Sequence, residues 1–356
     1  MKKLKLNKSL KDNIITFGIV IVCFIIIEIL MSLGLVSSLI KGLLVPLCVY
    51  IIVAIALNLC VGILGELSLG HAGFMCVGAF TGAFFSKVFE NIITFAPLRF
   101  FLAIIIGAAL AGLVGLLIGI PVLRLKGDYL AIVTLAFGEI IKNIINVLYI
   151  GRDSNGFHIS IKDSLSLGLE SDGEIIINGA QGITGTPKNS NFEVGILLII
   201  ITLFIVLNLI NSRSGRAIMS IRDNTIAAES LGINITKYKL MAFSVSAALA
   251  GVAGVLYSHN LSSLMAQPKN FGYNMSITIL VFVVLGGIGN IRGSIIAAVV
   301  LTLIPELLRG LNDYRMLIYS IVLIVMMLYN WSPKFIDMRK RYSIKNLFKK
   351  NAKEAE

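Results

Sequence analysis

The chain has 356 residues, of which 57% are hydrophobic and only 14% are charged, and its mean hydropathy is +0.91. Soluble domains carry about a quarter charged residues, so this composition excludes an ordinary soluble protein and predicts an integral membrane protein. The net charge of +12 would suggest nucleic acid as a partner for a soluble protein, but the basic residues gather at the ends of apolar runs, which indicates membrane orientation and contact with lipid headgroups instead.

Apolar runs long enough to cross a bilayer, about 20 residues of helix each, recur along the chain. None alternates with the period of two that barrel strands require, and a helix satisfies its backbone hydrogen bonds within one segment. The sequence therefore predicts an all-α, polytopic integral membrane helical bundle of about ten transmembrane helices. The predicted spans are 14–34, 40–60, 62–86, 100–120, 129–150, 192–211, 239–258, 275–290, 294–309 and 315–331.

Lysine and arginine are concentrated on alternate connecting segments. The N-terminus, the segment 212–239 and the chain after Trp331 are rich in them, whereas the intervening connections carry few. By the positive-inside rule this asymmetry places both termini in the cytoplasm, with the chain in an inner membrane. Residues 1–331 are then the transmembrane domain, and 332–356 form a basic cytoplasmic tail beside the inner leaflet.

The third apolar run begins with GELSLGHAGF, residues 65–74, which is too polar for a helix interior. Its glycines weaken a helix, its carboxylate is ionisable at membrane depth, and its serine and histidine lie three residues apart and so on one side. We predict a broken third helix that lines a polar pathway. The alternative is a cytoplasmic turn with a solvated glutamate. The candidate pathway residues in this run are Glu66, Ser68, Gly70, His71 and Phe74.

The fifth run carries a second buried charge. Asp128 is a plausible helix cap, and Glu139 follows eleven residues later, near the middle of the span. Lys142 is positioned to pair with it at the i,i+3 spacing. An intramembrane carboxylate is a candidate for a transport pathway, and a structural ion pair is the equally open alternative.

Two connecting segments differ from the rest. The outer segment 151–191 is long, acidic and rich in Gly, Ser and Asn, which indicates either an ordinary loop with a short hairpin or a docking surface. The inner segment 212–239 is helical in pattern, with Asp223 or Asn224 as a cap and Gly232 as a stop. Such an amphipathic helix lies on the membrane or docks into a partner.

Several chemistries lack their signatures. Gly287 and Gly289 resemble a nucleotide loop only in isolation, because the flanks are membrane-length runs, and a tight turn between spans explains them better. No phosphate-loop motif occurs, and the three histidines have no metal-ligand spacing. We therefore expect no catalytic residues, no metal and no cofactor in this chain. Small residues at four-residue spacing, such as Gly115 with Gly119 and Gly251 with Ala247, predict close helix packing.

The motifs GELSLGHAGFMCVGAF, LKGDYLAIVTLAFGEI, NGAQGITGTP, GRAIMSIRDNTIAAESLGINITKYKL and VLGGIGNIRGS occur in that order. Together they resemble the LivM-type permeases of bacterial branched-chain amino-acid ABC importers. The resemblance covers residues from about Val49 to Leu308. It implies a second permease subunit, cytoplasmic ATPase subunits that bind ATP–Mg, and an extracytoplasmic substrate-binding protein as partners.

The resemblance also assigns the segment 212–239 to coupling with the ATPase. The family's coupling loop differs here, because Ile226 stands where the general pattern has glutamate and the proline-containing ending is missing. The alternatives that stay open are an importer of urea or short amides within the same family, and an ion-coupled secondary amino-acid transporter outside it. The coupling candidates are Arg216, Arg222, Ala227, Ala228 and Gly232.

Overall fold

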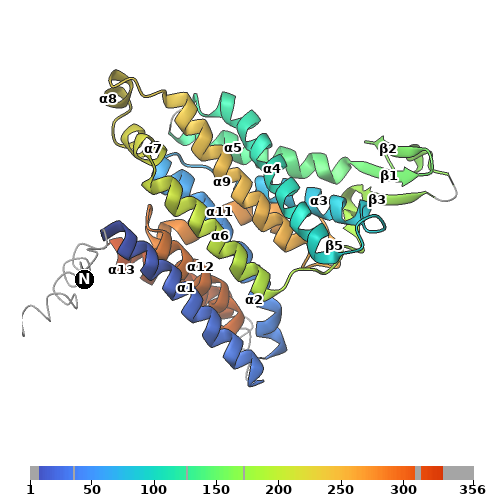
Figure 1. The fold of residues 1–356 in the computed structure, drawn as a ribbon, viewed down its shortest axis with the longest axis horizontal. Helices are drawn as coiled ribbons and strands as arrows, with labels where there is room; N and C mark the ends of the chain where they lie inside the picture. Colours follow the sequence, from blue (N-terminus) through green and yellow to red (C-terminus); the bar gives the residue numbers. More distant parts are fainter. Residues whose placement is uncertain (1–7, 35–36, 126, 171–172, 309–313, 332–356) are drawn as a thin grey trace, which may run out of the picture.

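The computed structural model describes residues 8–34, 37–125, 127–170, 173–308 and 314–331. Within these ranges, ten long helices follow the order of the ten predicted spans, which confirms the all-α membrane fold (Figure 1). The predicted basic tail, 332–356, lies outside the described residues. The ten helices are α1 (Lys8–Ser32), α2 (Ser38–Asn58), α3 (His71–Val88), α4 (Ala96–Val122), α5 (Asp128–Val147), α6 (Phe192–Asn211), α9 (Ile235–Ser258), α11 (Tyr273–Gly286), α12 (Ile291–Leu307) and α13 (Arg315–Trp331).

Most of these helices have the length and composition of a membrane span. Within the described residues, seven helical segments are long and apolar enough to cross a bilayer. The other three long helices are slightly shorter or less apolar, since α3 has 18 residues and α12 and α13 have 17 each. The chain is therefore a multi-pass membrane protein.

The two ends of the bundle carry different short elements (Figure 1). One end, called the α8 end, holds α7 (Arg213–Asp223) and α8 (Thr225–Ser230). The other, called the sheet end, holds an antiparallel sheet of order β2-β1-β3, the pair β4–β5, and the short helices η2, η3 and α10. One of the two alternatives for the segment 151–191 included a short hairpin, and the structure has one, β1–β2, which already begins at Tyr149. The bounds are β1 (Tyr149–Asp153), β2 (Gly156–Ser160), η2 (Leu165–Leu167), β3 (Glu174–Asn178), η3 (Gly179–Gln181), β4 (Ile183–Thr184), β5 (Ser263–Leu264) and α10 (Pro268–Phe271).

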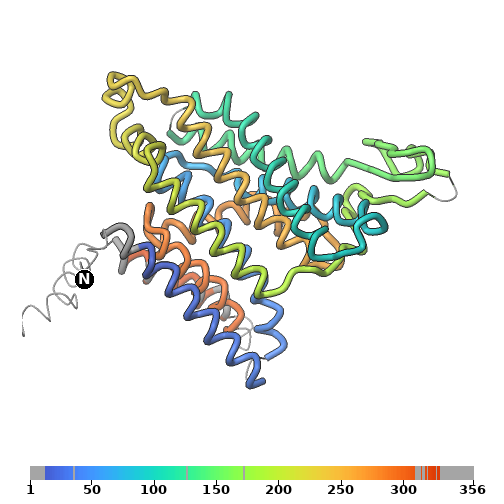
Figure 2. Tube along the Cα trace, viewed as in Figure 1, coloured from blue at the N-terminus to red at the C-terminus, as the bar shows by residue number. Residues whose placement is uncertain are grey.

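Helix α9 is the centre of the packing, where it contacts α2, α3 and α4. Figure 2 shows it running through the bundle beside α4. A Cβ added to Gly115 of α4 would lie 2.4 Å from the Ala247 Cβ of α9, and one added to Gly251 would lie 2.4 Å from the Ala111 Cβ. The small residues therefore let these backbones approach closely, as their spacing predicted.

The position of the helix break differs from the prediction. Helix α2 continues as a π-helical turn, η1 (Leu59–Leu64), and ends at Gly65, whose φ of 82° lies in the left-handed region that favours glycine. Residues 65–70 are not helical, and α3 starts at His71. The predicted third span, 62–86, therefore combines the end of one helix, a non-helical link and a shorter helix. Apolar periodicity alone gave no sign that the preceding helix extends to Leu64.

Candidate functional site

The link between α2 and α3, residues 65–70, enters the bundle from the α8 end and is called the re-entrant segment. Just after it, His71 Nε2 lies 2.7 Å from the Ser246 hydroxyl of α9. Ser246 lies about 16 Å along α9 from Ile235, which is close to the middle of that 24-residue helix. Non-helical backbone thus reaches membrane depth, which proteins tolerate only where other protein or a water-filled cavity surrounds it.

Side chains from distant helices satisfy the backbone around the re-entrant segment. The Leu69 N–H donates to Thr134 Oγ1 of α5 at 3.0 Å, and the Ala72 N–H donates to Ser276 Oγ of α11 at 3.3 Å. Gly70 packs directly on α5, because an added Cβ would lie 2.8 Å from the Thr134 carbonyl oxygen. The sequence could not reveal these partners, since they are far away along the chain and belong to no periodic pattern.

The polar residues of the predicted pathway form a buried cluster. Ser68 Oγ lies 3.3 Å from His71 Nδ1, so the two side chains share one side as predicted. The Ser246 hydroxyl, the partner of His71 on α9, donates to the Ala56 carbonyl oxygen. Phe74 packs edge-on against an aromatic ring of α9. Ser68 and His71 are 1% exposed and Phe74 is 2% exposed, so the subunit's own helices enclose this cluster.

Glu66 is the charged residue of the re-entrant segment, and it forms an ion pair with Lys239 of α9. Only 15% of the Glu66 side chain and 13% of the Lys239 side chain are exposed. The alternative of a freely solvated glutamate is therefore wrong. Lys239 was not among the predicted functional residues, although it belongs to the basic segment that the sequence singled out.

Glu139 joins α5 to α11. Its carboxylate forms the predicted ion pair with Lys142, and its Oε1 also accepts a hydrogen bond of 2.7 Å from the backbone N–H of Tyr273, the first residue of α11. A quarter of the Glu139 side chain is exposed, whereas the Lys142 side chain is 7% exposed. Asn143 lies four residues after Glu139 on α5, and Asn274 follows Tyr273 on α11. Both asparagines are exposed. Polar groups therefore lie on an outer face of the bundle, at the level where α11 begins.

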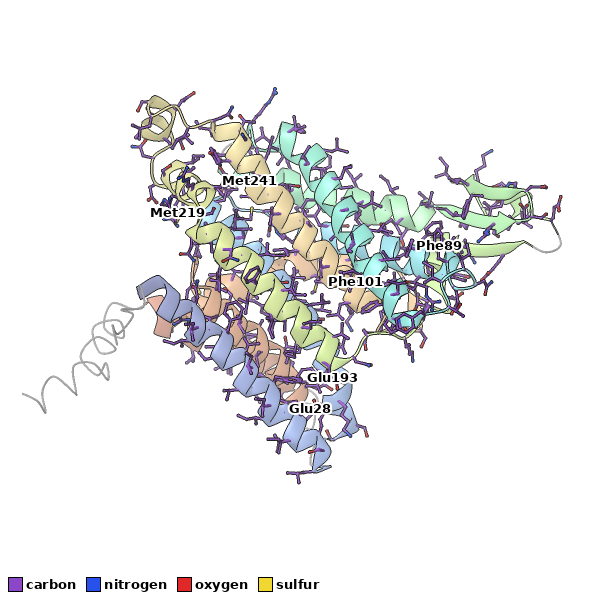
Figure 3. All side chains as sticks on the ribbon, viewed as in Figure 1. Glu28, Phe89, Phe101, Glu193, Met219 and Met241 are labelled. Atoms are coloured by element: carbon purple, nitrogen blue, oxygen red, sulfur yellow. The ribbon has the colours of Figure 1, made fainter. Side chains whose placement is uncertain are left out.

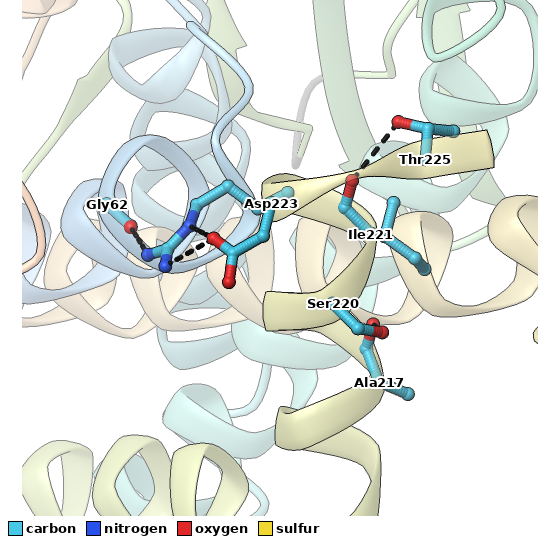
Figure 4. Close-up of polar contacts among 7 residues, drawn as sticks. Gly62, Ala217, Ser220, Ile221, Asp223 and Thr225 are labelled. Carbon is cyan, nitrogen blue, oxygen red and sulfur yellow. Dashed lines mark hydrogen bonds and ion pairs between the residues drawn. The ribbon is translucent and has the colours of Figure 1, made fainter. Parts of the chain in front are cut away.

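Helix α7 contacts the end of α2 and the start of the re-entrant segment. Helix α7 buries Ile218 and Ile221, and Arg222 Nη1 donates a 3.0 Å hydrogen bond to the carbonyl oxygen of Gly62 in η1 (Figure 4). The aliphatic part of the Arg222 side chain covers Gly65, since a Cβ on Gly65 would lie 2.5 Å from Arg222 Cγ. Arg222 thus joins α7 to the point where α2 ends and the re-entrant segment begins.

Helix α8 presents apolar side chains at the tip of the α8 end. As predicted, Asn224 caps it, because its side chain accepts a 3.0 Å hydrogen bond from the Ala227 N–H. Ile226 is 81% exposed and Leu231 is 80% exposed, while Ala228 is buried underneath. The other coupling candidates, Arg216, Ala227 and Gly232, are exposed. Two large exposed aliphatic side chains at this tip are typical of a surface that contacts another protein or the membrane.

The sheet end carries its own polar turn and apolar face. Burial of the Asp153 carboxylate opposes its ionisation, but hydrogen bonds from the Asn155 N–H and from the His158 side chain outweigh burial and hold the pKa of Asp153 below its usual range. Phe157 and Ile159 of β2 are 54% and 68% exposed on one face of the sheet. Within the described residues, no three His, Cys, Asp or Glu side chains gather as metal ligands would.

Comparison with known proteins identifies the family. The model of the branched-chain amino acid transport system permease component matches residues 39–328. The chain belongs to this family. The LivM high-affinity branched-chain amino acid permeases of Salmonella typhimurium and Escherichia coli are each 36% identical over 296 residues, covering 80% of this chain and 67% of each relative.

A more distant relative is the probable LivM branched-chain amino acid permease of Methanocaldococcus jannaschii. It is 26% identical over 211 residues, which cover 58% of this chain and 55% of that protein. No solved structure matches. The family match includes both the re-entrant segment and α7–α8, so these features belong to the permease domain itself.

Proposed function

We propose that this permease forms half of the conduit of an ATP-driven importer for branched-chain amino acids. A separate cytoplasmic ATPase binds ATP–Mg, a second permease subunit completes the conduit, and an extracytoplasmic binding protein delivers the substrate. The single observation that carries the proposal is the Arg222 contact, because it joins α7, which leads into the exposed tip of α8, to Gly62 and Gly65, where α2 ends and the re-entrant segment begins.

The ATPase docks on the tip of α8. Ile226 and Leu231 lie there without cover, and the acidic and basic side chains around them, including Glu229 and Lys237, are exposed as at the polar rim of an interface. Movement of α7–α8 on ATP binding pulls on Gly62 through Arg222. Lys239 forms a second connection, because it joins the first turns of α9 to Glu66. The ATPase therefore favours one arrangement of the re-entrant segment over another, which is what coupling requires.

The amino acid passes along the face formed by α5 and α11. Glu139, Asn143 and Asn274 expose polar groups there, and polar groups in contact with lipid are unfavourable. A second permease subunit facing this surface would exclude lipid and leave a polar conduit for a zwitterion. The exposed aliphatic residues Ile140 and Ile277 suit the substrate's apolar side chain. Behind this face, inside the subunit, lie the buried residues Ser68, Gly70, His71 and Phe74. They support the conduit wall without lining it.

Reconstitution tests the proposal. The chain is co-expressed with candidate ATPase, second permease and binding-protein subunits from the same genome, and the stoichiometry of the purified complex is measured. In proteoliposomes we expect leucine uptake that needs ATP and the binding protein and persists when ionophores collapse ion gradients. Uptake that follows an ion gradient without ATP would instead establish a secondary transporter. A ligand screen of the binding protein separates branched-chain amino acids from urea and short amides.

A further inference from the structure

A groove between α4 and α6, at the sheet end of the bundle, has no part in the proposed transport cycle. Its volume is about 690 Å³, and its floor is α9, which contributes Leu249 and Val252. The walls are apolar and include Phe101 of α4 and Ile201 of α6, which are 58% and 43% exposed. Figure 3 shows Phe101 on the outer surface of the bundle. Helices α4 and α6 both pack on α9, and the groove separates them.

The groove has the length of one leaflet. Its lining on α4 runs from Ala96 to Ala108, a distance of about 18 Å along a helix. Half of a bilayer's hydrocarbon core is about 15 Å thick. A transmembrane helix of another subunit would have to cross both leaflets, whereas the groove accommodates an acyl chain of the leaflet on the sheet side.

The mouth of the groove attracts an anion. Lys188 and Asn189 line it, and Asn189 Nδ2 is shielded from water without a hydrogen-bond partner among the described residues. Helices α4 and α6 both start at this mouth, and neither has a side-chain cap, so the positive ends of two helix dipoles face it. Glu193, in the first turn of α6, does not line the groove.

We propose that this groove binds one anionic phospholipid from the leaflet on the sheet side. An acyl chain lies between α4 and α6 against Leu249 and Val252, and the phosphate sits at the mouth against Lys188 and Asn189. The apolar length, the single lysine at its end and the unpartnered amide beside it together specify a lipid with a charged headgroup. This site is independent of the ATPase and of the transported substrate.

Native mass spectrometry of the full chain tests the headgroup contact. The purified chain is stripped of lipid in mild detergent and titrated with phosphatidylglycerol or phosphatidylcholine. We expect one tightly bound phosphatidylglycerol per chain and weaker binding of phosphatidylcholine. Lys188→Gln should weaken phosphatidylglycerol binding about tenfold, as for loss of one charge-assisted contact. Lys162→Gln, which removes an exposed lysine elsewhere at the sheet end, should leave it unchanged. Equal affinity of the two variants would overturn the proposal.

A second variant tests the groove itself. Ile201→Trp places a large side chain across the groove at a position that is already half exposed, and we expect it to weaken binding of both lipids. Ile29→Trp makes the same change on α1, where Ile29 is 52% exposed, and should have no effect. Unchanged lipid binding in Ile201→Trp would place the lipid elsewhere. The cysteine introduced by Phe101→Cys can also be tested for covalent cross-linking in native membranes. A cross-link to another protein would show that a protein occupies the groove, and would also overturn the proposal.

Discussion

Removing the Arg222 side chain should uncouple ATP hydrolysis from transport. Arg222→Ala deletes the 3.0 Å hydrogen bond to the Gly62 carbonyl and uncovers Gly65. A hydrogen bond from a charged group contributes about 1.5–3 kcal/mol. The Arg222 side chain is 37% exposed, so screening by water lowers its contribution to about 1–2 kcal/mol. Arg222 also pairs with its neighbour Asp223, but that pair lies within the coupling segment and transmits nothing to α2.

This loss translates into a measurable ratio. An energy of about 1–2 kcal/mol changes the balance between two states by about 5- to 30-fold. We therefore expect the amount of leucine transported per ATP hydrolysed to fall by about that factor in proteoliposomes, while the complex still assembles and still hydrolyses ATP. For Arg222→Lys, the amount of leucine transported per ATP should lie between the values for the unmodified chain and for Arg222→Ala. Lysine keeps the charge but not the planar, multi-donor geometry of arginine.

Two comparisons make the Arg222 prediction refutable. Arg124→Ala removes the same charge at the same end of the bundle, from an exposed side chain just after α4, and should leave the ratio unchanged. Gly65→Ala introduces a Cβ 2.5 Å from Arg222 Cγ at a φ of 82°, so it should displace Arg222 and reproduce the uncoupling. The reasoning fails if Arg222→Ala transports as much leucine per ATP as the unmodified chain, or if Arg124→Ala loses as much as Arg222→Ala.

Three further predictions concern the packing and the charges. Gly70→Ala should destabilise the chain by about 1–3 kcal/mol, because its Cβ would lie 2.8 Å from the Thr134 carbonyl oxygen of α5. Gly42→Ala is the control, because its Cβ would meet nothing within 4 Å. Thermal unfolding in detergent measures the difference in stability. Glu66→Gln should cost about 1–3 kcal/mol, because it leaves the largely buried Lys239 without its partner. Adding Lys239→Gln should then cost little more, so the double-mutant cycle should be non-additive. Because the pKa of Asp153 is lowered in the folded chain, its contribution to the β1–β2 hairpin is present above its ordinary pKa and is lost as the pH falls through the lowered value; hydrogen exchange of the hairpin amides against pH measures this loss.

Each of these predictions has a clear contrary result. Equal melting temperatures for Gly70→Ala and Gly42→Ala would mean that the segment yields without loss of packing. A strictly additive cycle for the Glu66–Lys239 pair would mean that the two charges do not stabilise one another. Hairpin protection that falls at the same pH in Asp153→Asn as in the unmodified chain would remove Asp153 as the cause.

The sequence carried most of the information about the helices. Each span needs about 20 apolar residues whatever its neighbours are, so the count and order of spans could be read from hydropathy. Contacts between residues close in sequence could also be predicted, because helical or turn spacing brings such residues together. Examples are the Glu139–Lys142 pair, the Asn224 cap and the shared side of Ser68 and His71.

Only the tertiary structure decided what the unusual residues touch. Lys239, Ser246 and Arg222 come to the region around the re-entrant segment from α7 and α9, more than 150 residues away along the chain. Nothing in a single sequence links such positions, because the contact depends on how whole helices cross. For the same reason hydropathy placed the break inside the third helix, whereas the packing of η1 against α7 let α2 extend to Leu64. The sequence determined which segments lie in the membrane, and the packing of α9 against α2, α3 and α4 determined which of their polar groups meet.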